Sequence, residues 1–146
     1  MTDGTASARP PWHLWMVGGL TLLWNGYGAF DYVMSVTQNA AYMAMFTEDQ
    51  RAYYAAFPSW ATSIWAIAVW GGVTGSILLL LRSKAAVIVF EIALAASLIS
   101  LVHIYIMTNG AQVVGPIGMA VSAAITAISV FEVAYAYVMR RRGTLK

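Results

Sequence analysis

The sequence predicts an all-α integral membrane protein, a bundle of four transmembrane helices with a short helix on its external side. The 146 residues are 60% hydrophobic and only 10% charged, whereas an ordinary soluble domain is about 25% charged. Four apolar stretches each reach the ~20 residues that are needed to cross a ~30 Å hydrocarbon core. All basic residues except Arg51 fall on one side of these stretches. One compact membrane domain is therefore expected.

The transmembrane domain is expected to cover residues 12–139. The first stretch is longer than the ~7–15 apolar residues of a signal peptide, so we expect it to remain in the protein. Residues 1–11 are expected to form a short cytoplasmic tail, and residues 140–146 a basic cytoplasmic tail. The four spans are expected at about 12–34, 59–81, 85–107 and 115–139.

The basic residues predict the orientation of the chain. They precede the first span, separate the second from the third and follow the fourth. Cytoplasmic loops of membrane proteins carry an excess of Lys and Arg. Both termini are therefore expected in the cytoplasm, and the connection that carries Arg51 on the outside.

The external connection, residues 35–58, contains a helix signal. Thr47 and Gln50 have the spacing of a capping box, T-x-x-Q, and Pro58 disfavours helix at the residue before it. We expect a helix from Glu48 to Phe57. Its aromatic residues predict that it lies on the membrane surface or covers the bundle, either as an anchor or as a lid.

Polar residues near the external ends of the spans are candidates for a ligand site. At 1.5 Å per residue, Asp31 and His103 lie about 10–12 Å outward from the middle of their spans. A carboxylate and amides among aromatic faces suit a small polar ligand such as a sugar, a cation or a quinone head group. Alternatively, Asp31 is an interfacial residue in contact with water. The candidate ligand-binding residues are Asn25, Asp31, Tyr32, Trp65, His103 and Tyr105.

Two glutamates lie in the inner half of the membrane. The same arithmetic places Glu91 and Glu132 about 6–7 Å from the middle of their spans, on the cytoplasmic side. Carboxyl groups inside a membrane are costly and usually have a partner within the bundle. Glu91 and Glu132 are therefore candidates for proton coupling, for a plain hydrogen bond between carboxylic acids, or for pairing with the basic residues Arg82, Lys84 or Arg140.

Several classes of protein are disfavoured. There is no cysteine, and neither a P-loop nor an H-E-x-x-H motif is present. His13 and His103 lie near opposite ends of the expected bundle, too far apart for one haem iron in a monomer. We expect no enzyme activity, no metal, no cofactor and no nucleic-acid partner.

Residues 11–82 resemble a bacterial family. The stretches W-N-G-Y-G-A-F-D-Y-V-M and F-P-S-W-A-T-S-I-W-A-I-A-V-W-G-G carry the likeness. The family consists of short four-span inner-membrane proteins, some of which are labelled sugar transporter. The resemblance implies the bacterial inner membrane and a carbohydrate substrate. The residues that carry it are Trp24, Asn25, Asp31, Tyr32, Pro58, Trp60 and Trp70.

Three functions remain open at the level of the sequence. The first is an accessory or structural membrane protein that associates with itself or with a membrane complex. The second is a small oligomeric transporter of a polar, sugar-like solute, with proton coupling through the glutamates. The third is a subunit associated with a quinone or a redox complex. In each case the lipid bilayer is the expected surrounding.

Overall fold

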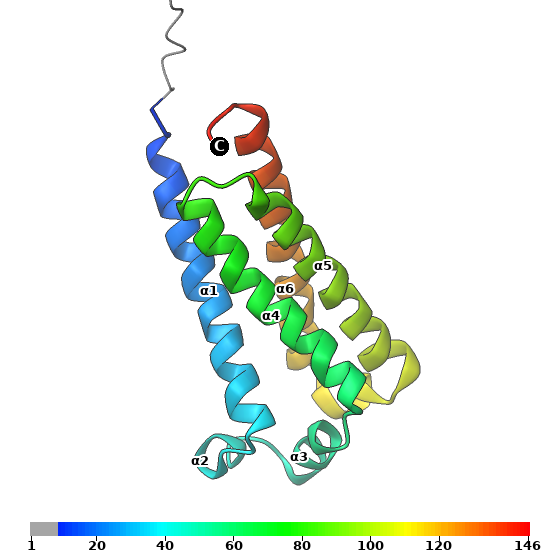
Figure 1. Cartoon of the computed structure of the whole chain (residues 1–146). Coiled ribbons are helices and arrows are strands. Elements are labelled where there is room, and N and C mark those ends of the chain that lie inside the picture. Colours follow the sequence, from blue (N-terminus) through cyan, green and yellow to red (C-terminus); the bar gives the residue numbers. More distant parts are fainter. Residues whose placement is uncertain (1–8) are drawn as a thin grey trace, which may run out of the picture.

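The computed structural model describes residues 9–146, and this part of the chain folds into helices joined by short connections (Figure 1). The four long helices lie side by side, and the two short helices lie across one end of the bundle. In chain order the helices are α1 (Trp12–Val36), α2 (Ala40–Met43), α3 (Glu48–Ala55), α4 (Ser59–Leu80), α5 (Ala85–Val102) with the π-helix η1 (His103–Met107), and α6 (Gly110–Arg141).

Three of the long helices are long and apolar enough to cross a membrane. They are α4, the continuous α5–η1 helix over Ala85–Met107, and α6. The 25-residue α1 covers the first expected span but is not among the three. Its length is sufficient, but Asn25, Asp31 and several tryptophan and tyrosine residues lower its mean hydropathy.

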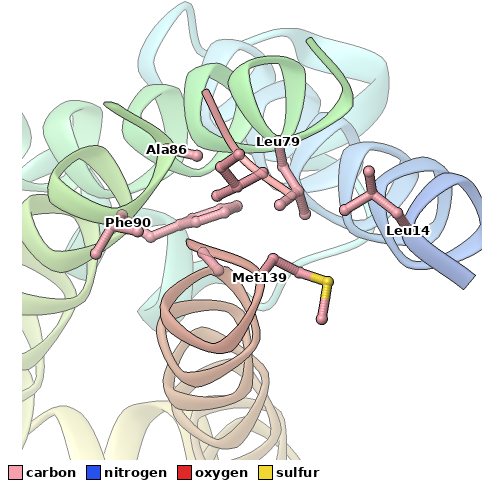
Figure 2. Packing of buried hydrophobic residues seen from close by; sticks show 8 residues of the cluster. Leu14, Leu79, Ala86, Phe90 and Met139 are labelled. Atoms are coloured by element: carbon pink, nitrogen blue, oxygen red, sulfur yellow. The ribbon is translucent and has the colours of Figure 1, made fainter. Parts of the chain in front are cut away.

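The bundle has two different ends. The end that holds Trp12 and Arg141 is called the terminal end here, and the end covered by α2 and α3 the loop end (Figure 1). The hydrophobic core lies at the terminal end, where α1, α4, α5 and α6 all contribute (Figure 2). Its largest fully buried side chains are Phe90, Leu14, Leu79, Met139, Leu145 and Val87.

A close helix contact positions this core. A β-carbon placed on Gly75 of α4 would lie 2.6 Å from the ring of Phe90, which is 1% exposed. Only glycine therefore lets α5 approach α4 this closely. In membranes, such small-residue contacts allow van der Waals packing between helices.

The segment after α6 differs from the expected basic tail. Gly143 has a φ of +68°, and the chain turns back onto the α4–α5 connection. There the backbone N–H of Lys146 donates to the carbonyl of Arg82 at 2.6 Å, and Arg82 Nε donates to the carbonyl of Thr144 at 3.0 Å. Leu145 is 1% exposed within the core. Residues 142–146 thus close the terminal end of the bundle.

At the loop end, α3 begins as expected and stops slightly earlier. The reciprocal capping box between Thr47 and Gln50 is present, which satisfies two of the free N–H groups at the helix start. The helix ends at Ala55 instead of Phe57. The short helix α2 was not expected, and the side chain of Asn39 caps it by accepting from the N–H of Tyr42.

The final helix also starts earlier than the sequence indicates. Helix α6 begins at Gly110 rather than at 115 and is interrupted at Gly115, whose φ is +65°. Pro116 follows, and proline has no N–H to continue the helical ladder. The break puts a kink in the helix at the loop end, where α6 contacts α3.

Candidate functional site

The candidate site is a cavity of about 350 Å³ at the loop end of the bundle, called the loop-end cavity here. Every helix contributes to its wall, because α2 and α3 close one side and the four long helices form the rest. Aromatic side chains are the largest group in its lining. The aromatic residues are Tyr27, Tyr42, Phe46, Tyr54, Phe57, Trp60, Trp65 and Tyr105.

Asp31 lies in the wall of this cavity and is held by the external segment. Its Oδ1 accepts a hydrogen bond from the hydroxyl of Tyr42 on α2. The ring of Tyr42 also meets the ring of Phe30 edge to face, with 5.7 Å between centroids. Burial, and next the adjacent Asp31, raise the pKa of Tyr42 above its ordinary value, so this phenol stays neutral and keeps donating.

His103 lies in the same wall, in the first turn of the π-helix η1. Its ring meets Phe57 and Trp60 edge to face, with centroids 5.0 Å and 4.9 Å away. Single π turns inside α-helices are frequent at functional sites. One turn before it, the buried Oγ of Ser100 has no hydrogen-bond partner.

Two tyrosines connect the wall to other elements. The hydroxyl of Tyr105 lies 2.7 Å from Ser122 Oγ and so ties η1 to α6. Tyr54 on α3 faces the cavity, and its ring lies 6.4 Å from that of Trp65. Burial, and next the charge of Asp31, raise the pKa of Tyr54 to about 12. The aromatic cover of the cavity is therefore uncharged at neutral pH.

A second cavity of about 150 Å³ continues toward the middle of the bundle and is called the mid-bundle cavity here. It reaches Asn25, halfway along α1, and Ser129 on α6. The two cavities are neighbours because they share four lining residues. These are Tyr27, Asp31, Val121 and Ile125.

At the foot of the mid-bundle cavity, Asn25 connects three helices. Its Nδ2 lies 2.6 Å from Glu132 Oε1, 2.9 Å from the carbonyl oxygen of Thr21 and 3.2 Å from Ser76 Oγ, so its two N–H groups are shared among three acceptors. Glu132 is 3% exposed. A β-carbon on Gly72 would lie 2.2 Å from Asn25 Oδ1, so this glycine makes room for the amide.

The candidate residues divide into those at the loop-end cavity, those at mid-bundle, and Glu91, which lies apart from both. Asp31, Trp65, His103 and Tyr105 line the loop-end cavity, and Tyr32 supports it from behind through an edge contact with Trp65 at 5.0 Å. Asn25 and Glu132 form the polar contact at mid-bundle.

Glu91 lies apart from both sites. It is on the exposed face of α5, between the exposed residues Ile88 and Ile92. Glu91 and Glu132 share a depth in the sequence-based estimate, but they point to different sides of the bundle because only Glu132 is buried. Of the alternatives that the sequence leaves open, a direct hydrogen bond between these two carboxyl groups is therefore not formed in this structure.

Several lining residues were not among the sequence candidates. Tyr42, Tyr54 and Phe57 come from the external segment, and Ser122 from α6. The aromatic density of residues 42–57 is a signal for the first three. Ser122 has no comparable signal, because one serine in a helix rich in alanine is typical of packing.

The chemistry of the lining is uneven. Among residues 9–146, Asp31 is the only acidic residue that lines either cavity, and no Lys or Arg of this part of the chain lines them. Within residues 9–146, no group of three His, Cys, Asp or Glu side chains is placed to hold a metal ion. The arrangement thus presents aromatic faces, hydroxyl groups and one carboxylate to a bound molecule.

Comparison with models of known protein families, with curated proteins and with solved structures finds no match. The helices themselves indicate the class of the protein, a helical membrane protein. It is all-helical over the described residues, and three of its helices are long and apolar enough to span a membrane.

Proposed function

We propose that the protein is a four-span protein of the bacterial inner membrane, with α1 as the fourth span. At 1.5 Å per residue, the 25 residues of α1 reach about 37 Å, more than the ~30 Å hydrocarbon core. Helix α1 also packs along α4. The side with most of the basic residues is then the cytoplasmic side, so the terminal end lies inside and the loop end outside.

Within this frame we propose that the protein is a binding or accessory protein that holds a small ligand in the loop-end cavity. The observation that carries this function is the cavity itself, about 350 Å³ in volume and lined by residues from every helix. Ligand sites are typically concave and apolar or aromatic, with a few convergent polar groups.

Self-association is part of the proposal. Glu91 lies on the exposed face of α5 among isoleucines, and an intramembrane carboxylate is costly when it faces lipid alone. A second copy or a subunit of a membrane complex is expected to cover this face.

Substitution of Val121 by tryptophan tests the binding function. Val121 lines both cavities and is 49% exposed, so a large side chain there fills the cavities and leaves the core intact. Met119→Trp is the matched control, since Met119 is equally exposed on α6 and lines neither cavity. Native mass spectrometry after gentle extraction is expected to show a small molecule on the wild type and on Met119→Trp, and none on Val121→Trp.

The mass of the bound molecule identifies it and so distinguishes between the proposed functions. A sugar or other polar solute supports the transporter function, and a quinone supports association with a redox complex. A stoichiometric unrelated protein without a small molecule, or equal ligand on all three proteins, contradicts a ligand site in the cavity.

Proton-coupled transport is the second candidate, favoured by the contact of Asn25 with Glu132. This contact joins a buried carboxyl group to a residue that lines the mid-bundle cavity. In proteoliposomes, glucose uptake driven by an imposed pH gradient is expected to fall at least tenfold in Glu132→Gln. Glu91→Gln is expected to keep it, since Glu91 lies outside the cavities. Uptake that is unchanged in Glu132→Gln rules out coupling through this residue.

A further inference from the structure

The two cavities form one groove that is open toward the side of the bundle. They share Tyr27, Val121 and Ile125, which are 64%, 49% and 40% exposed although they line cavity walls. These residues belong to α1 and α6. The groove is therefore accessible from between these two helices.

The packing of α6 explains this side opening. After the break at Gly115, the buried residues of α6 are Glu132, Ala136 and Met139, all near its terminal end. None of the most apolar 18-residue window of α6 is buried. The outer half of α6 therefore stands away from α1, and in a membrane this gap faces the lipid chains.

The groove changes in chemistry along its length. On α1 it runs from Ser35 in the loop-end cavity to Trp24 in the mid-bundle cavity, which is about 16 Å at 1.5 Å per residue. The loop end has the carboxylate of Asp31 and most of the aromatic rings. The mid-bundle part is lined largely by apolar and small residues, such as Ala68, Val69 and Ala93.

The charge of the lining selects among amphipathic molecules. Of the residues that the structure describes, Asp31 is the only acidic one in the lining and no Lys or Arg contributes to it, so an anionic head group would meet no counter-charge from them. A cation is attracted by the carboxylate and by the faces of aromatic rings within about 6 Å. Tyr54 and Trp65 are among the aromatic rings that share the loop-end cavity with Asp31.

We propose that the ligand is a lipophilic organic cation, with its charged head among Asp31 and the aromatic rings and its apolar chain along the groove between α1 and α6. This proposal rests on the binding function proposed above and names the class of its ligand. A quaternary ammonium head with one alkyl chain has the matching chemistry, because it offers a positive charge and no hydrogen-bond donor. The chain enters from the membrane through the side opening.

The test uses dodecyltrimethylammonium as the probe and the full-length protein in nanodiscs of uncharged lipid. Binding is followed by the quenching of tryptophan fluorescence, with empty nanodiscs as the background. Asp31→Asn is expected to weaken binding at least tenfold. The amide oxygen of asparagine can still accept from Tyr42, so the fold is retained. Glu48→Gln, which removes an exposed carboxylate of α3 outside the cavities, is expected to bind like the wild type.

Two further measurements make the result decisive. Dodecanol has the same chain without the charge and is expected to compete poorly, and Val121→Trp is expected to abolish binding while Met119→Trp keeps it. Equal binding by Asp31→Asn and the wild type, or equal competition by dodecanol, overturns the cation proposal. If the mass spectra show an uncharged molecule on the wild type that is lost in Val121→Trp, the proposed binding function is retained and only the cation proposal fails. If the cavity is empty there and binds no cation, both proposals fail.

Discussion

Phe90→Ala is expected to lower the free energy of unfolding by about 3 kcal/mol, the lower end of the range for such truncations in packed cores. Phe90 is the largest fully buried side chain and contacts the core formed by all four long helices. Its removal leaves a void that the rigid helix backbones cannot fill. Unfolding of the detergent-solubilised protein, followed by circular dichroism, measures the loss.

A double-mutant cycle isolates the contact between Phe90 and Gly75. Gly75→Ala alone forces a β-carbon to within 2.6 Å of the ring and is expected to cost about 1–3 kcal/mol through overpacking. Combined with Phe90→Ala, the new methyl group occupies part of the void. The two losses should therefore add to clearly more than the loss in the double variant. Gly26→Ala, where nothing lies within 4 Å of the added carbon, is the control. Strict additivity would refute the contact.

Asn25→Leu is the second large effect, with an expected loss of about 2 kcal/mol. Hydrogen bonds between helices in membranes average about 0.6 kcal/mol, but this substitution also leaves the buried carboxyl group of Glu132 without its donor. An unsatisfied buried polar group costs about 1–3 kcal/mol. Thermal unfolding of the solubilised protein measures this loss.

The partner variants show which part of the loss is due to the pair. Glu132→Gln preserves an oxygen that accepts from Asn25 and is expected to cost less than 1 kcal/mol. The double variant Asn25→Leu and Glu132→Leu removes both polar groups and should be more stable than Asn25→Leu alone. If it is less stable than Asn25→Leu, the contact at 2.6 Å does not determine the energetics of this layer.

The sequence predicts the helices better than the way in which they pack. Apolar length and composition indicate the extent of α4, and the capping box indicates the start of α3 at Glu48. The start of α6 is missed because Gly110 and Gly115 suggest a loop, although the chain is helical on both sides of Gly115. The fold of residues 142–146 is missed because a run of arginines is typical of a solvated tail, whereas Leu145 is the residue that enters the core.

The candidate site is predictable where depth alone decides and not where helix rotation decides. Counting residues places Asp31 and His103 in one layer, and both line the loop-end cavity. Counting also places Glu91 and Glu132 in one layer, but the rotation of α5 turns Glu91 outward. The rotation of a helix about its axis depends on contacts with its neighbours, such as that of Phe90 with Gly75. These contacts are known only once the two helices are packed in three dimensions.

Leu14 and Leu145 lie in one cluster although nearly the whole chain separates them. Contacts between distant parts of a chain form late in folding, since closing a long loop costs entropy before the contact compensates for it. The hairpin of α4 and α5, joined by a few residues, is expected to assemble early. The terminal end then stays open until residues 142–146 pack against it, so the closure of this end depends on the segment that follows α6.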